Sequence, residues 1–422
     1  MDSKPKKIVI IGNPYSVFPT FFAEEFQKFN HYVQIVSRNV TGKIKNQNET
    51  EYISTSEYES VYVKILIRIV VYFISPLENL LIFLNRSRYK NAMGSESVDK
   101  PKVSTAIIEA LSISHYVNNF KPDFVYGQEV FTYGLATAWV KNCPRIVMPW
   151  GGDIFMYANT SWMASKLVKY ILNSVDLINP TAASSFDYMK RNFAVNVNKF
   201  HATPWCLSVD NIQQNLQKYS KAELKKRLNI PKDSTVIMNV RRLKDAWGAN
   251  SIIKAFVNLA RKRENIFFIV VVGAAPGKEL KQLDELVTQH NLQDKFLIKR
   301  DKISPEEYSL LVCASEIFTS FMIERDMRSS SIVQGLFANS LPIINDQPEY
   351  RLMENQGMKA IFADPNDHIH ISNSIDSYIY DTKIRRDTLA KNLIFLKENH
   401  SNEKNFSVLL DRIELLLLKD KF

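Results

Sequence analysis

Short runs of apolar, mostly β-branched residues recur along the chain, and helical stretches separate them. Such runs are typical of strands that are buried on both faces of a parallel sheet. Alternation of strands and helices on this scale predicts an α/β protein with two doubly wound sheets. A first array of runs falls at residues 7–12, 31–36, 122–127 and 145–149, and a second at residues 235–240, 266–273, 295–298, 316–321 and 341–344.

The length of the chain predicts more than one domain. A chain of 422 residues exceeds what one hydrophobic core usually organises, and the strand pattern pauses near Pro204 and Trp205. Because ligands of open α/β sheets bind beyond the carboxyl ends of the strands, two such domains predict a shared interdomain cleft. The expected parts are an N-terminal Rossmann-like domain over residues 1–210, a C-terminal one over 211–390, and closing helices over 391–422.

The composition is that of a folded globular protein, with 45% hydrophobic and 23% charged residues. A net charge of +10 is compatible with nucleic acid, anionic lipid or a phosphorylated substrate. The basic residues are scattered and accompany no nucleic-acid-binding motif, so nucleic acid is not an expected partner. Cys143, Cys206 and Cys313 indicate neither a disulfide framework nor a zinc site, and residues 1–7 do not resemble a secretory signal. We therefore expect a cytoplasmic protein.

Four segments of the second half form an ordered series of motifs. A charged helix at 222–231 precedes the first strand of the second array, which ends in two arginines, Arg241 and Arg242. A glycine turn begins at Gly273, after the next strand. Three serines at 329–331 then precede an apolar helical run, and the backbone NH groups at the start of such a helix are suited to bind phosphate.

Taken in this order, these segments resemble the retaining GT-B glycosyltransferases of group 1, also called family 4, which include bacterial lipopolysaccharide, capsule and phosphatidylinositol sugar transferases. The resemblance covers residues 204–348 well and the N-terminal half in outline. It implies transfer of a sugar, with retention of configuration, from a nucleoside-diphosphate sugar to a saccharide or lipid-linked acceptor in polysaccharide biosynthesis. It also implies a reaction without a bound metal or other cofactor, in which cationic side chains stabilise the departing diphosphate.

The resemblance assigns donor-binding roles to residues on the loops that follow the strands. Either Arg241 or Arg242 is expected to face the diphosphate, and Gln334 is expected to reach a ribose hydroxyl. Arginines at strand ends and serines before helices are also common as solvated side chains and simple caps, so the assignment depends on their order along the chain. The donor set is Arg241, Arg242, Lys244, Gly273, Ser330, Ser331 and Gln334.

Two positions depart from the pattern of the family. The family has two glutamates separated by seven residues; here Asp326 and Gln334 have that spacing, and Glu324 is an alternative first acid. Asp326 and Glu324 are therefore candidate catalytic residues. The family also has a lysine five residues after its arginine, where this chain has Trp247, so Lys244 is the nearby substitute. These departures support a second hypothesis, a catalytically silent GT-B protein that binds sugars or serves as a partner subunit.

The first half offers fewer candidates. The sequence Pro-Trp-Gly-Gly-Asp at residues 149–153 follows a strand and resembles the family's loop on the acceptor side. Asp153 is expected either to position an acceptor hydroxyl, as a third catalytic candidate, or to cap the following helix. Gly12 ends the first strand and is a weaker candidate for donor binding. His115 and His201 belong to no ligand pair and are assigned no role.

Residues 62–90 are unusually rich in apolar side chains. The uncharged runs within them are much shorter than the ~20 residues that span a bilayer. Two hypotheses follow: a pair of buried helices, or an interfacial element that inserts apolar residues among lipids while its basic residues meet anionic headgroups. The composition favours the second, a peripheral contact with an anionic membrane surface. The basic residues of this segment are Lys64, Arg68, Arg86, Arg88 and Lys90.

Overall fold

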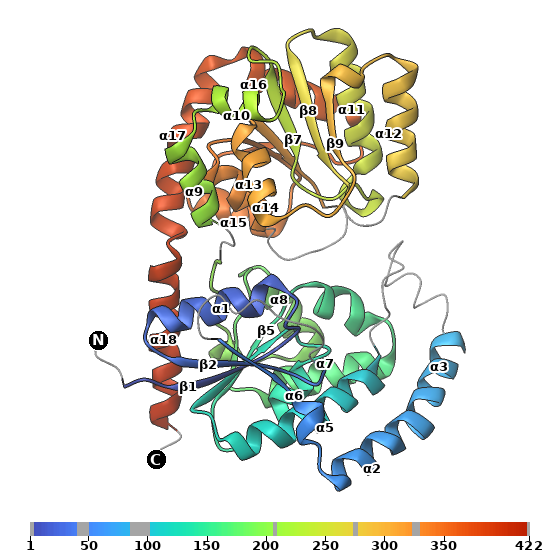
Figure 1. Cartoon of the computed structure of the whole chain (residues 1–422), viewed down its shortest axis with the longest axis vertical. Helices are drawn as coiled ribbons and strands as arrows, with labels where there is room; N and C mark the ends of the chain where they lie inside the picture. The colour runs from blue at the N-terminus through green and yellow to red at the C-terminus, as the bar shows by residue number, and fades with distance from the viewer. Residues whose placement is uncertain are drawn as a thin grey trace. The chain divides into compact units, whose positions relative to one another are not determined.

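The computed structural model describes residues 4–39, 50–84, 102–205, 209–272, 277–322 and 330–419. The chain divides into two compact units, shown in Figure 1. Unit 1 comprises Met1–Pro204 and Glu403–Phe422, and unit 2 comprises Trp205–Asn402. Over the described ranges, each unit contains a six-stranded sheet whose neighbouring strands are parallel. The predicted α/β class with two doubly wound sheets is therefore confirmed.

The strands of unit 1 are β1 (Lys7–Ile11), β2 (Tyr32–Ser37), β3 (Glu51–Ser54), β4 (Phe124–Gln128), β5 (Arg145–Met148) and β6 (Leu177–Ile178). They lie in the order β3-β2-β1-β4-β5-β6. The order of the strands reverses between β1 and β4. In an open α/β sheet, ligands bind outside the carboxyl ends of the strands at such a switch point.

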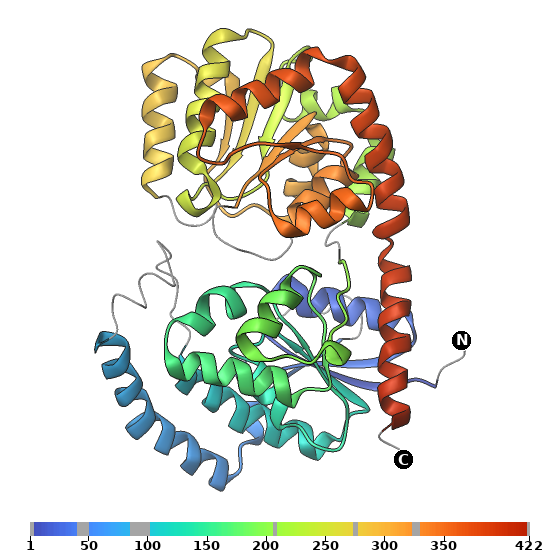
Figure 2. The same cartoon turned by 180° about the vertical axis from the view of Figure 1, so that it is seen from behind.

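Helices cover both faces of this sheet, as the two opposite views in Figures 1 and 2 show. They are α1 (Val17–Lys28), α2 (Val61–Ile69), the π-helical segment η2 (Val70–Ile74), α3 (Ser75–Leu84), α5 (Val103–Phe120), α6 (Gly134–Trp139), α7 (Trp162–Ser174), α8 (Ser185–Phe193) and α18 (Asn402–Lys419). The last of these returns to unit 1 because Phe406 packs against three phenylalanine rings of α1, with centroids 5.5–6.0 Å away.

The sheet of unit 2 repeats the topology of unit 1. Its strands are β7 (Thr235–Asn239), β8 (Ile266–Val271), β9 (Phe296–Lys299), β10 (Ile317–Ser320), β11 (Leu341–Ile344) and β12 (Ile361–Phe362). They lie in the order β12-β11-β10-β7-β8-β9, so the switch point lies between β7 and β10. Successive residues of β7 enter different cores, with Val236 and Met238 on one face and Ile237 on the other, as expected for a sheet buried on both sides.

The helices of unit 2 supply those two cores. They are α9 (Val209–Lys218), α10 (Lys221–Arg227), α11 (Ala249–Lys262), α12 (Lys278–Gln289), α13 (Pro305–Ala314), α14 (Ser330–Phe337), α15 (Pro348–Asn355), α16 (His368–Tyr380) and α17 (Thr382–Asn399). Apolar residues of α11 and α16 pack on one face of the sheet, and those of α13 and α14 pack on the other. The loops that follow the strands lie at the carboxyl edge of the sheet.

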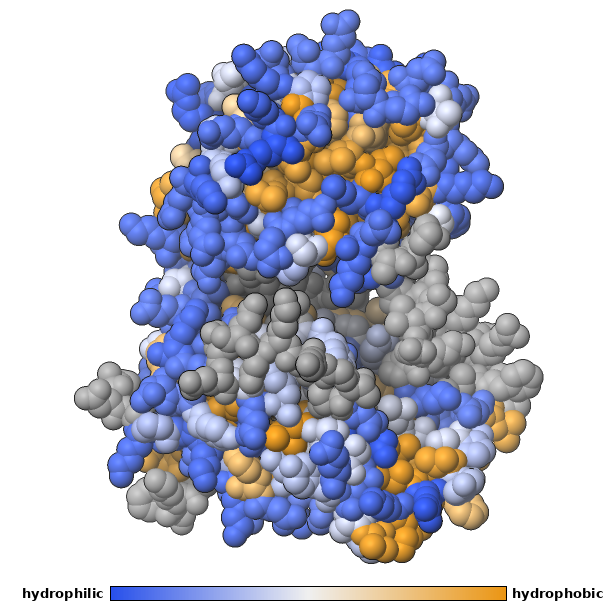
Figure 3. Space-filling model, in the orientation of Figure 1, coloured by the Kyte–Doolittle hydropathy of each residue, from blue (hydrophilic) through white to orange (hydrophobic). Residues whose placement is uncertain are grey.

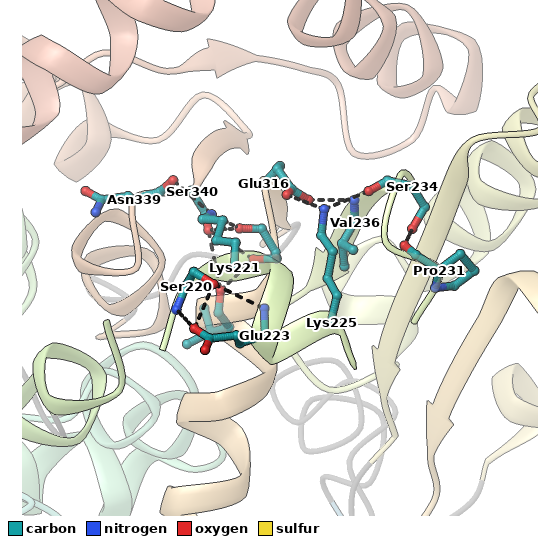
Figure 4. Close-up of polar contacts among 12 residues, drawn as sticks. Ser220, Lys221, Glu223, Lys225, Pro231, Ser234, Val236, Glu316, Asn339 and Ser340 are labelled. Atoms are coloured by element: carbon teal, nitrogen blue, oxygen red, sulfur yellow. Dashed lines mark hydrogen bonds and ion pairs between the residues drawn. The ribbon is translucent and has the colours of Figure 1, made fainter. Parts of the chain in front are cut away.

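Polar contacts attach α10 to the amino edge of this sheet, as Figure 4 shows. The helix begins with a capping box, in which Ser220 and Glu223 each bind the other's backbone NH. Lys225 donates to the carbonyl of Ser234 at 2.8 Å and forms a 2.6 Å ion pair with Glu316. Lys221 donates to the backbone carbonyls that precede β10 and β11, and burial lowers the pKa of its ammonium group to about 8.

The segment α2-η2-α3 forms an arm at one side of unit 1 (Figure 1). Its inner side is fixed to the unit: Val63, Ile67 and Val70 are buried, and the carboxylate of Glu78 accepts the first backbone NH groups of α5 at 2.6 and 2.9 Å. Its outer side is apolar and exposed, and Figure 3 shows these apolar residues gathered over α2 and α3. In the described part of the chain, no helix is long and apolar enough to cross a membrane.

Candidate functional site

The switch point of unit 2 is lined by polar residues at the ends of two neighbouring strands. Asn239 ends β7, and its amide group donates to the backbone carbonyl of Arg241 at 2.8 Å. Thr319, in β10, donates to the amide oxygen of Asn239 at 3.3 Å. The hydroxyl of the adjacent Ser320 is buried and has no hydrogen-bond partner within the described ranges. The loop that begins at Arg241 is therefore fixed at the edge of the sheet where a ligand is expected.

Three predicted donor-binding cations converge on one aromatic ring. The guanidinium carbons of Arg241 and Arg242 lie 4.5 and 5.6 Å from the centroid of the Trp247 ring, and the ammonium of Lys244 lies 5.0 Å from it. Arg241 is half-buried and Arg242 is exposed. Trp247, which departs from the family pattern, thus lies at the centre of the cationic cluster. We call these four residues the Trp247 cluster.

The helix predicted to face phosphate begins next to this edge. Ser330 and Ser331 lie in the first turn of α14. Gln334 lies one turn further along the helix and is buried. The helix packs closely on β10, because a Cβ atom on Gly335 would lie 2.5 Å from the ring of Phe318. This close approach requires glycine and lets α14 pack directly on β10.

The loop that carries the candidate acids is fixed where it leaves the sheet. The amide group of Asn345, just after β11, binds the backbone NH of Met322 at 2.9 Å and its carbonyl at 2.6 Å. Gln347 donates to the same carbonyl at 3.0 Å. The candidate acids Glu324 and Asp326 follow Met322 and lie outside the described residues, as does Gly273.

At the switch point of unit 1, Gly12 follows β1 and Gln128 ends β4. A Cβ atom on Gly12 would lie 3.0 Å from the Cβ of Gln128, so the absence of a side chain permits the close approach of these two strand ends. The indole NH of Trp150 donates to the amide oxygen of Gln128 at 3.2 Å, and the indole ring packs on Phe18. The amide nitrogen of Gln128 is buried without a hydrogen-bond partner among the described residues.

Asp153 fastens two loops of unit 1 to each other. The side chain is 1% exposed, and its carboxylate accepts the backbone NH groups of Val130, Trp150 and Ile154 at 2.6–3.1 Å. These contacts hold the loop after β4 against the loop after β5. The two roles that the sequence left open, positioning an acceptor hydroxyl and capping the following helix, stay predictions.

Glu129 is a second buried carboxylate beside Asp153, and sequence reasoning missed it. Its backbone has a positive φ of 73°, which is rare for a residue with a side chain, and its carboxylate accepts the NH groups of Phe131 and Thr132. Burial, and then the charge of Asp153, raises the pKa of Glu129 to about 8, and burial raises the pKa of Asp153 to about 6. The two carboxyl groups therefore hold a proton at neutral pH.

Gln128, Glu129, Asn239 and Ser320 were not predicted as site residues. Each one ends or directly follows a buried apolar strand, and that position was the signal available in the sequence. Within the described ranges, no group of three histidine, cysteine or acidic side chains is placed to hold a metal ion. The described cysteines, Cys143 and Cys313, are buried.

Residues 220–394 match the profile of the family described as Glycosyl transferases group 1. This segment lies in unit 2 and contains the Trp247 cluster and α14. Unit 2 thus contains a glycosyltransferase group 1 domain, and the two-unit fold has the GT-B architecture, as the resemblance predicted.

Solved structures of the same fold match nearly the whole chain. A glycosyltransferase from Rickettsia africae is 14% identical, with 98% of this chain and 99% of that chain covered and a TM-score of 0.66. Anabaena HepE, solved in complex with UDP and glucose, is 12% identical, with 97% and 100% covered and a TM-score of 0.65. An α,α-trehalose-phosphate synthase (UDP-forming) from Burkholderia vietnamiensis is 9% identical, with 96% and 99% covered and a TM-score of 0.68. A comparison with curated protein sequences finds no match.

Proposed function

We propose that the chain transfers a sugar from a nucleoside-diphosphate sugar, held by unit 2, to a saccharide or lipid-linked acceptor. The observation that carries the proposal is the Trp247 cluster, which gathers three cations at the switch point of a group 1 domain. The diphosphate gains negative charge as the sugar departs, and fixed cations stabilise that charge where it develops. Ser330 and Ser331, in the first turn of α14, supply backbone NH groups for the same phosphates.

Three further elements of the proposal rest on similarity. Retention of configuration follows from the resemblance to retaining members of the family. UDP is the first nucleotide to test, since it occupies the similar structure of Anabaena HepE. The candidate acids Asp326 and Glu324 and the amide of Gln334 are proposed to contact the donor sugar and ribose, without a bound metal.

Arg241 and Arg242 provide the decisive test. Thermal-shift measurements against UDP, GDP and ADP and their sugars should show stabilisation of the wild-type chain, because ligand binding to the native state raises its stability. Replacing Arg241 and Arg242 with alanine should remove that shift and abolish transfer while the chain still folds. The matched control replaces Arg261 and Lys262, two adjacent exposed cations at the other end of α11. Unchanged turnover in the Arg241 and Arg242 variant would refute the proposal.

The alternative of a catalytically silent protein makes a different prediction. A silent sugar-binding or partner subunit would show a thermal shift with a nucleotide sugar but would neither transfer nor hydrolyse it. Slow hydrolysis of the donor by the pure wild-type chain, lost in the Arg241 and Arg242 variant, therefore separates the enzyme from the silent protein.

We further propose that the arm of unit 1 attaches the enzyme to an anionic membrane, at its cytoplasmic face, where lipid-linked acceptors of polysaccharide biosynthesis are available. Tyr62 and Phe73 are 70% and 73% exposed, which is unusual for aromatic side chains in a folded unit. Lys64 and Arg68 are exposed on the same helix and complement anionic headgroups. The remaining predicted basic residues, Arg86, Arg88 and Lys90, lie outside the described residues.

Liposome sedimentation tests this attachment. Replacing Tyr72 and Phe73 with serine should weaken sedimentation with anionic liposomes at every salt concentration, because insertion of apolar groups resists salt. Replacing Lys64 and Arg68 with glutamine should weaken it mainly at low salt, because headgroup attraction is screened. The control replaces Leu393 and Ile394, two exposed apolar residues of unit 2, with serine. Failure of the wild-type chain to sediment at low salt, or self-association through the arm, would contradict the proposal.

A further inference from the structure

Trp247 lies in a tight turn that joins β7 to α11. Its backbone NH binds the carbonyl of Lys244 at 2.9 Å, and the NH of Gly248 binds the carbonyl of Asp245 at 2.9 Å. Gly248 has a φ of 73°, and a Cβ atom there would lie 3.0 Å from the carbonyl oxygen of Pro365. Glycine at this position therefore lets the turn close, and the turn determines where the indole lies.

The acid within this turn is already engaged. Asp245 forms a 2.5 Å ion pair with Lys278 and accepts from the amide of Asn250 at 2.5 Å. Arg242 forms no ion pair with a carboxylate of the described residues, and its described contact is with the ring. All three cations of the cluster lie next to the indole.

Three like charges near one another repel, so their side chains need an attraction that holds them in place. An aromatic ring attracts a cation to its face through its quadrupole, and indole is the strongest such ring in proteins. All three charged groups lie within 5.6 Å of the indole centroid. Side chains held in this way lose less conformational entropy when an anion binds between them, because they are already ordered.

We infer that Trp247 is a positioning residue that orders Arg241, Arg242 and Lys244 for a diphosphate ligand. The inference rests on the proposed function and adds that the geometry of the cations depends on the ring. Charge alone predicts that removal of the ring leaves binding unchanged, since all three cations remain. Ordering by the ring predicts that an aliphatic residue weakens binding and that another aromatic residue restores it.

Isothermal titration of the full chain with UDP, GDP, ADP and inorganic pyrophosphate measures this difference. Trp247→Leu should weaken binding of every probe that the wild-type chain binds by about tenfold, and Trp247→Phe by no more than about threefold. The matched control is Tyr380→Leu, which removes the ring 4.7 Å from Arg263 in the same unit and should leave binding unchanged. In transfer assays, Trp247→Leu should raise the KM for the donor more than it lowers kcat.

Each outcome separates the inference from the function on which it rests. If the wild-type chain binds none of the four probes, the proposed function fails. If it binds and Trp247→Leu binds equally well, the function stands and the ordering role is overturned. If Trp247→Leu does not fold, Trp247→Phe and Trp247→Tyr carry the test: folded aromatic variants that lose tenfold or more in affinity would overturn the role of the ring.

Discussion

The ion pair between Lys225 and Glu316 should contribute measurably to the stability of unit 2. Glu316 precedes β10, and its carboxylate binds both the ammonium of Lys225 at 2.6 Å and the backbone NH of Val236 at 2.8 Å. The two donors bind different carboxylate oxygens, so in Glu316→Gln the single amide oxygen accepts from one of them and the amide NH2 group faces the other. The change therefore leaves one polar group at the amino edge of the sheet without its partner.

Burial decides the size of this effect. Removing one partner of a fully buried pair costs about 3–5 kcal/mol, whereas a surface pair contributes about 0–1 kcal/mol. The side chains of Lys225 and Glu316 are 9% and 17% exposed, and Lys225 keeps its contact with Ser234. We therefore expect a loss of about 2–3 kcal/mol in the free energy of unfolding. For a unit of this size, that loss corresponds to a decrease of roughly 4–12 °C in Tm.

A matched substitution compares this buried pair with an exposed one. Lys299 and Glu307 form an ion pair of 2.7 Å in the same unit, but their side chains are 30% and 38% exposed. Glu307→Gln makes the same change in net charge and should cost less than about 1 kcal/mol. Calorimetry of the full chain gives the Tm, and hydrogen exchange of peptides from α10 and β7 locates the loss in unit 2. Equal effects of the two substitutions would refute this reasoning.

Three further predictions concern pH, packing and metals. Because the pKa values of Glu129 and Asp153 are raised to about 8 and about 6, the folded chain binds more protons than the unfolded chain from about pH 4 to pH 8. The free energy of unfolding should therefore fall as the pH rises through that window, and Glu129→Gln should reduce the dependence; a curve of unchanged slope would contradict the raised pKa of Glu129. Gly335→Ala should cost about 1–3 kcal/mol in urea unfolding because its Cβ meets the Phe318 ring, whereas Gly152→Ala, with no atom within 4 Å, should be nearly neutral. Transfer should persist in excess chelator, and a complete loss that Mn²⁺ or Mg²⁺ restores would show that a metal is needed.

The central strands of both sheets could be predicted from the sequence, because each is a short apolar run buried on two faces. The predicted run at 235–240 corresponds to β7, and the run at 341–344 corresponds to β11. The edge strands β3, β6 and β12 were missed. β6 and β12 have two residues each and β3 has four with one buried residue, so none carries a hydrophobic pattern long enough to recognise.

For the candidate site, the sequence indicated the residue types but not the residues that they contact. Arg241, Arg242 and Lys244 were predicted from their position after a strand, but Trp247 was interpreted only as a departure from the family. The contact of its ring with the cations depends on the turn that Gly248 closes. The neighbour of Asp153 was missed for a similar reason, because Glu129 lies on a different loop and meets it only when β4 and β5 pair.

Local pattern by itself determined which segments are buried strands, which helices follow them, and which chemical groups lie at the carboxyl edge of each sheet. These features follow from the hydrophobic period and from residues near one another in sequence. Tertiary structure alone decided that α18 returns to unit 1 through Phe406, that the arm keeps an exposed apolar side, and that two carboxylates share a buried loop junction. Contacts between residues far apart in sequence depend on the order of the strands and on side-chain packing. Strand order and packing are determined by the free energy of the whole unit, and no single segment determines them.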